Sequence, residues 1–174
     1  MIQLTDLVEG MPAITPGFGR YLAEAGAVCL ESQGHSQGQH LTVNEGQGRS
    51  GSYSVTWPVV TEQILRCLND PEVATEHGAV GIAVLLTKKL VGYSVIQRSR
   101  KGTGFDYWLG DDTELPFQSK ARLEVSGIRS GNLSAVKSRV KQKRRQTDPS
   151  DGTHLTAHIV VVEFGAPLAE MEQK

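Results

Sequence analysis

The segment from His158 to Phe164 constrains the fold most, because its side chains are nearly all apolar and β-branched. A strand of this kind is covered on both faces of its sheet. The chain has 174 residues, of which 39% are hydrophobic and 21% are charged, which is typical of one globular domain. We therefore predict a single α+β domain, residues 1–174, built as an α/β sandwich with a central mixed β-sheet and flanking helices.

The elements that precede this strand can be assigned in order. Asp70 and Pro71 are typical of a helix start, because aspartate caps the helix and proline is favoured at its first position. That helix should run to about Leu90, and alternating apolar and polar residues predict the strands that follow it. The predicted strands are 92–98, 105–109 and about 120–126. A basic helix then begins near Leu133 and ends before Asp148.

The first third of the chain predicts a helix and a β-hairpin that precede the core. Apolar residues at three- and four-residue spacing indicate a helix from Pro16 to about Ser32. Alternating residues around 41–43 and 53–55 indicate a β-hairpin, and Pro58 should begin a short helix. We accordingly divide the domain into an N-terminal helix and hairpin, a core and a short tail. Their ranges are 1–57, about 58–165 and 166–174.

Two acidic residues on the predicted strands are candidates for binding a metal ion. Asp106 and Glu124 fall on the polar faces of what should be adjacent strands. Carboxylate oxygens are the ligands that Mg²⁺ and Mn²⁺ prefer, and such a cation activates water and stabilises charge on a phosphodiester under attack. The alternative is that both residues are solvated on the wet face of a sheet. Spacing alone does not separate these alternatives.

The order helix, three strands, helix, strand resembles the core of the PD-(D/E)XK nuclease superfamily, the fold of many restriction and repair endonucleases. The resemblance covers about residues 71–164 and rests on Gly-Phe-Asp-Tyr at 104–107 and Leu-Glu-Val-Ser at 123–126. It implies a restriction-endonuclease-like αβββαβ core. It also implies a catalytic site in which Asp106 and Glu124 bind Mg²⁺ or Mn²⁺.

The same resemblance concerns five further residues. Glu76, early in the preceding helix, stands where some members of the superfamily carry another acidic residue. Ser126 stands where the superfamily motif has a lysine. A lysine from a neighbouring position can replace it in the superfamily, and the candidates are Lys120, Lys137 and Lys141. A degenerate site is the alternative.

Basic residues gather in the run 129–145, which contains no acidic residue although the formal net charge of the chain is −1. Lys137, Lys141 and Arg144 are spaced to line one helical face, on which phosphates could bind without sequence preference. A solvated face or a docking surface for an acidic protein explains the pattern equally well. A second basic cluster lies at the turn before Asp106. It consists of Arg98, Arg100 and Lys101.

Two function hypotheses follow. The first is a metal-dependent nuclease, or a nuclease-like DNA-binding subunit of a larger bacterial assembly with a defence or genome-maintenance role. The second is a non-catalytic interaction module that binds a partner through the basic helix 131–145 or the hairpin. A homodimer or a partner protein is expected under the first hypothesis. Cys29 and Cys67 lie in apolar helical contexts, so we predict that both thiols are reduced and buried. Because the chain shows no signal peptide or membrane-spanning run, we predict a cytoplasmic protein without membrane partners.

Overall fold

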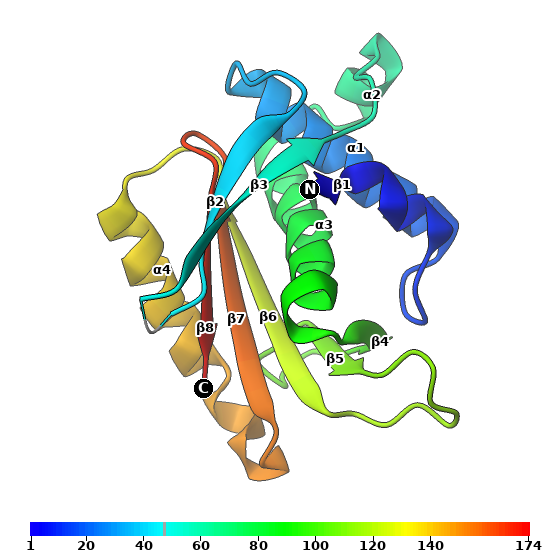
Figure 1. Ribbon diagram of the computed structural model, residues 1–174, viewed down its shortest axis with the longest axis vertical. Helices are drawn as coiled ribbons and strands as arrows, with labels where there is room; N and C mark the ends of the chain where they lie inside the picture. Colours follow the sequence, from blue (N-terminus) through cyan, green and yellow to red (C-terminus); the bar gives the residue numbers. More distant parts are fainter. Residues whose placement is uncertain (47) are drawn as a thin grey trace.

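One mixed β-sheet extends through the chain, and helices cover both of its faces (Figure 1). The computed structural model describes residues 1–46 and 48–174. In this part of the chain the strand order is β1-β3-β2-β8-β7-β6-β5-β4. The strands are β1 (Ile2–Gln3), β2 (Gln39–Asn44), β3 (Ser50–Thr56), β4 (Ser94–Arg98), β5 (Tyr107–Gly110), β6 (Ala121–Ile128), β7 (Thr156–Glu163) and β8 (Leu168–Gln173).

The helices fall into two layers. The α-helices are α1 (Pro16–Ser32), α2 (Glu62–Cys67), α3 (Pro71–Val91) and α4 (Leu133–Gln146). Two 3₁₀ helices, η1 (Leu4–Glu9) and η2 (Asp148–Thr153), complete the set. Helices α1 and α3 lie on one side of the sheet and α4 lies on the other (Figure 1). Of the helices described here, none combines the length and the apolar character that crossing a bilayer requires.

The predicted order from residue 71 to residue 164 is confirmed. After α3, strands β4, β5 and β6 form an antiparallel meander, and α4 then leads to β7, which pairs in parallel with β6. The N-terminal helix and the hairpin are confirmed as α1 and the antiparallel pair β2 and β3. The α+β sandwich with a mixed sheet is therefore the fold of this chain.

Side chains of β7 alternate between two apolar cores, as expected of a strand covered on both faces. Val160 and Val162 pack toward α1 and α3, whereas Ile159 and Val161 pack against α4. Helix α3 is apolar on most sides because it lies between the sheet and α1. The two helices cross where Gly26 meets Gly78, and a Cβ on Gly78 would lie 3.0 Å from the backbone of Gly26. This close crossing fixes α1 against the N-terminal half of α3.

Three expectations about local structure need correction. The segment 166–174, predicted as a tail, contributes β8, which lies inside the sheet between β7 and β2. The short helix predicted from Pro58 begins later, as α2 at Glu62. Cys67, predicted to be buried, is exposed at the end of α2. Strand β1, which the sequence did not predict, forms the edge of the sheet beside β3, and the 3₁₀ helix η1 follows it.

Candidate functional site

The site begins where β5 stops pairing with β6. Tyr107 is paired with Leu123, and the backbone N–H of Asp106 donates to the carbonyl of Leu123 at 2.9 Å. The next donor on β6, the N–H of Val125, is taken by the Asp106 carboxylate, whose Oδ2 accepts it at 2.9 Å. The Asp106 side chain thus replaces backbone pairing. For this reason β5 begins at Tyr107 and not at Phe105 as predicted, and β6 continues past it with a free edge.

Glu124 lies next to this carboxylate and is fully buried. Its Oε1 accepts hydrogen bonds from Lys143 Nζ at 2.7 Å and from Gln146 Nε2 at 2.9 Å, both on α4. Its Oε2 has no hydrogen-bond partner among the described residues. A buried acceptor without a partner is costly, by about 1–3 kcal/mol or more when it is charged. The sheet thus holds a carboxylate oxygen for which the surrounding protein provides no donor.

The two carboxylates share a site, and each affects the other. Burial raises the pKa of Glu124 to about 7; the negative charge of Asp106 raises it too, and the Lys143 ammonium opposes both. Burial also raises the pKa of Asp106, against the N–H of Val125 and the charge of Lys143. Near neutral pH the pair therefore tends to keep one proton, as neighbouring carboxylates do. A cation bound between them would take the place of that proton.

Lys143 was not among the lysines that the sequence singled out. It forms the only ion pair of Glu124 among the described residues and is largely buried. The apolar stripe of α4 contains Val136 and Val140 and continues to buried Thr147. Position 143 falls within this stripe at three- and four-residue spacing, so its side chain must point at the sheet. The position of Lys143 could therefore have been predicted from its spacing to Val136 and Val140. The prediction from sequence concerned only the face of Lys137, Lys141 and Arg144.

The three lysines proposed from the sequence lie elsewhere. Lys120 forms an ion pair with Glu114 at 2.9 Å before β6 begins. Lys137 and Lys141 are exposed on α4. Ser126, at the position of the motif lysine, accepts a hydrogen bond from Arg139 Nη1 at 2.8 Å. Thus α4 turns Lys143 toward Glu124 and Arg139 toward Ser126, while the face predicted to bind phosphates points away from the carboxylates.

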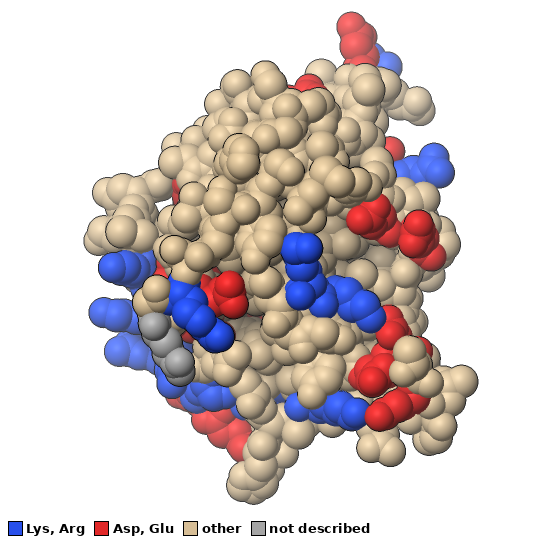
Figure 2. Space-filling model, viewed as in Figure 1, with Lys and Arg blue, Asp and Glu red and all other residues tan. Residues whose placement is uncertain are grey.

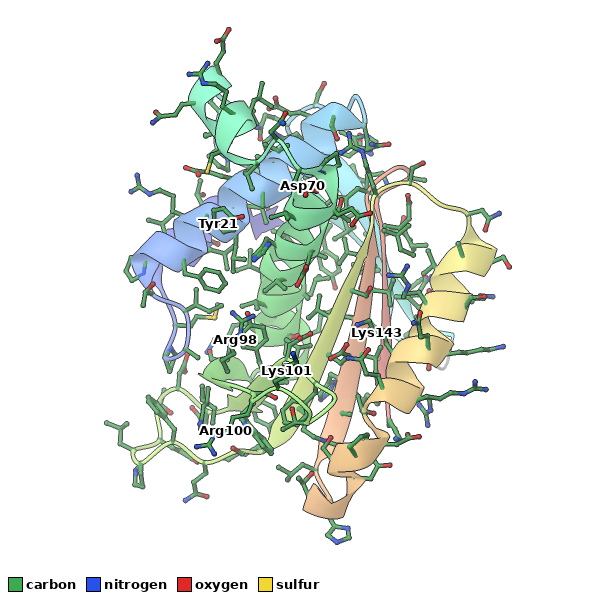
Figure 3. All side chains as sticks on the ribbon, turned by 180° about the vertical axis from the view of Figure 1, so that it is seen from behind. Tyr21, Asp70, Arg98, Arg100, Lys101 and Lys143 are labelled. Carbon is green, nitrogen blue, oxygen red and sulfur yellow. The ribbon has the colours of Figure 1, made fainter. Side chains whose placement is uncertain are left out.

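A cavity of about 840 Å³ opens beside the free edge of β6, between α3 and α4. Of the predicted residues, Asp106, Ser126, Glu76 and Arg98 line it. Its other basic residues are Arg129, Arg139 and Lys143. Figure 3 shows Lys143 between α4 and the sheet and Arg98 near the lower part of α3.

The remaining predicted basic residues lie outside the cavity lining. Arg100 and Lys101 are exposed in the turn that follows β4, near Arg98 (Figure 3). Arg144 donates to the carbonyl of Gln173 at 2.7 Å and therefore faces β8. Lys and Arg side chains gather along the edge of the molecule occupied by α4 (Figure 2). The basic side chains thus form two groups: one on the outer surface along α4 and a smaller one that lines the cavity.

The donors fit a hard divalent cation held by few protein ligands. No cluster of three or more His, Cys, Asp or Glu side chains suited to a metal occurs among the described residues. Mg²⁺ usually binds through one or two carboxylates and takes its other oxygens from water and substrate phosphates. Asp106, together with the unpartnered Oε2 of Glu124, meets that requirement, whereas softer metals would need nitrogen or sulfur ligands.

Taken together, the site has two coupled carboxylates, an ammonium group in contact with one of them and a cavity with several guanidinium groups. Such a set can hold a divalent cation and bind phosphate oxygens close to it. Comparison of the chain with protein-family models, with curated proteins and with solved structures gave no match.

Proposed function

We propose that the chain is a metal-dependent nucleic-acid phosphodiesterase that acts on DNA. The observation that carries the proposal is the meeting of Asp106, Glu124 and Lys143 beside a cavity with basic walls. The order of α3, the meander, α4 and β7 supports it, because this order resembles the core of the PD-(D/E)XK nuclease superfamily. In this proposal Lys143 takes the role of the motif lysine, whose position in this sequence is occupied by Ser126.

Each residue has a defined role in the proposed reaction. Asp106 and Glu124 would hold Mg²⁺ or Mn²⁺, which supplies an activated water and stabilises charge on the phosphate when bound. Lys143 keeps Glu124 oriented through its 2.7 Å contact and carries a positive charge to the developing oxyanion. Arg98, which lines the cavity, binds the neighbouring phosphates together with Arg129. Burial of Glu124 excludes water from one side of the carboxylate pair.

One observation favours a second candidate, a nuclease-like subunit that binds nucleic acid without cutting it. Glu124 is fully buried, and two α4 side chains already occupy its Oε1. A metal would have to reach Oε2 or displace Lys143. Under this candidate the chain works with a partner protein or as a homodimer, for instance in bacterial defence, and the exposed face of Lys137 and Lys141 contacts the partner. Both cysteines are free thiols in the described chain, which suits the cytoplasm for either candidate.

The decisive experiment is a cleavage assay on labelled DNA with Mg²⁺ or Mn²⁺. We expect the wild type to cut, and Asp106→Asn and Glu124→Gln to lose cutting while keeping the circular dichroism of the wild type. Asp112→Asn is the matched control, because Asp112 contacts Lys88 and Ser94 and lies outside the cavity lining. Cutting that survives in both site variants would refute the phosphodiesterase. Binding without cutting by the wild type would instead favour the non-catalytic subunit.

A further inference from the structure

The cavity has a wall that the proposed phosphate chemistry does not use. Phe18 of α1 and His77 of α3 both line it, with Val80 beside them. The His77 ring meets the Phe18 ring edge-on at 6.4 Å and the Tyr21 ring edge-on at 5.0 Å. Figure 3 shows Tyr21 on α1, beside the upper half of α3. Three rings from two helices therefore form one aromatic cluster at the edge of the cavity.

This cluster is held rigidly. His77 Nδ1 donates to the carbonyl of Val73 at 2.9 Å, which fixes the ring against its own helix. Phe18 is partly buried against the core that α1 and α3 share. A preformed aromatic surface of this kind binds a flat ligand with little loss of conformational freedom.

The charges of the cavity separate phosphates from the aromatic wall. Neither Arg98 nor Arg129 forms an ion pair within the described chain, so their charges remain available to a ligand. Glu72 and Glu76 line the α3 side, where they repel phosphate. The backbone of a bound strand is thereby directed to the guanidinium groups. The bases of the strand then face the rings of Phe18 and His77. Glu76 can accept hydrogen bonds from their exocyclic amino groups.

The size of the cavity selects the form of the substrate. A volume of about 840 Å³ lies within the range of pockets for small molecules, roughly 300–1,000 Å³. A base inside a duplex would have to leave its stack to enter, at the expense of a few kcal/mol. A base in a single strand enters without that penalty and stacks on an aromatic side chain whatever its identity.

We propose that Phe18 and His77 form a base-stacking subsite, so that the substrate of this site is single-stranded DNA. The inference rests on the proposed function for the meaning of the carboxylates, but its own evidence is the aromatic wall. Binding is measured with the Asp106→Asn protein, which should not cut, by fluorescence anisotropy of a labelled oligonucleotide and of its duplex with the complementary strand.

We expect the single strand to bind more tightly than the duplex, and Phe18→Leu to weaken single-strand binding by about 5- to 150-fold, the usual contribution of one stacked base. Leucine keeps the apolar packing of Phe18 but removes its ring, and Phe18→Tyr should bind like phenylalanine. Phe117→Leu is the matched control, because Phe117 is 42% exposed and lies outside the cavity lining.

The outcomes separate this inference from the proposed function. If duplex binds as tightly as single strand, or if Phe18→Leu binds like the parent, the stacking subsite is refuted even where the wild type cuts DNA. If the wild type does not cut DNA but Phe18→Leu still weakens single-strand binding, the phosphodiesterase is refuted and the stacking subsite is supported. If neither form of DNA binds, both are refuted.

Discussion

Two buried glutamates on neighbouring strands, Glu124 on β6 and Glu163 on β7, have opposite surroundings. Glu124 is 0% exposed and Glu163 is 1% exposed. Glu163 accepts hydrogen bonds from three backbone N–H groups, those of Gly131, Gly165 and Ala166, at 2.7–3.0 Å, and so uses both of its oxygens. Glu124 uses one oxygen, leaves the other without a partner and faces a second carboxylate.

The difference indicates that the Glu163 carboxylate stabilises the fold, whereas the Glu124 carboxylate has surroundings that suit a chemical role. Glu163 ties the connection between β6 and α4 and the turn between β7 and β8 to the end of β7, and backbone N–H groups bond both of its oxygens. Glu124 is kept buried beside Asp106 although neither the charge nor Oε2 is fully compensated. Perturbed titratable groups of this kind concentrate at functional sites. A substitution at Glu124 should therefore lower DNA cleavage, whereas a substitution at Glu163 should lower the stability of the fold.

The largest effect is expected for Glu124→Gln on DNA cleavage. The substitution keeps the shape of the side chain but removes the charge that a divalent cation needs. Because a metal site stabilises the reaction by several kcal/mol, the cleavage rate should fall roughly a thousandfold or more. Single-turnover cleavage measures this rate, and Glu163→Gln, compared per folded molecule, should stay within about tenfold of wild type. Equal losses in both variants would end the distinction.

The next effect separates two lysines of the same helix. Lys143→Met removes the ammonium group that contacts Glu124, and we expect cleavage to fall about 10²- to 10³-fold, as for loss of one electrostatic donor. Lys141→Met removes the same charge from an exposed position and should leave the rate of bond breaking unchanged. If Lys141→Met were the more damaging substitution, the outer basic face of α4, and not Lys143, would serve the reaction.

For Glu163 the expected loss is in stability. Glu163→Gln brings an amide NH₂ toward backbone N–H groups that lose their acceptor, and each buried donor left unpaired costs about 1–3 kcal/mol. We expect the free energy of unfolding to drop by about 3 kcal/mol in urea titrations. Glu124→Gln should show no such drop at neutral pH. A Glu163→Gln protein as stable as wild type would show that the turn does not depend on this carboxylate.

The sequence predicted the elements around the site because their signals are local. Asp70 caps α3 by accepting from the N–H groups of Glu72 and Val73, as its place before Pro71 indicated. Strand β8 could not be recognised in this way. Residues such as Leu168, Ala169 and Met171 favour a helix, and they form a strand because they pair with β7 and with β2, which lies far away in the sequence.

The candidate site was predictable in part for the same reason. Alternation along the strands placed Asp106 and Glu124 on one side of the sheet, because that side depends only on position within each strand. The complete burial of Glu124 depends on α4 folding over β6, and no local pattern records it. Nor does any local pattern bring Phe18 to the cavity, since that follows from the crossing of α1 and α3.

The smallest effect concerns how pH changes the stability of the Glu124→Gln variant relative to the wild type. The pKa of Glu124 is raised to about 7, above its ordinary value, so folding favours the protonated form. The stabilisation from that proton is complete below the ordinary pKa and is lost as pH rises through about 7. Glutamine resembles the protonated form at every pH. We therefore expect the stability of Glu124→Gln relative to wild type to increase by roughly 2 kcal/mol between about pH 5 and pH 7, measured by urea unfolding. Mg²⁺ should reduce the increase if it binds the ionised pair, and a difference that shrinks as pH rises without metal would contradict the raised pKa.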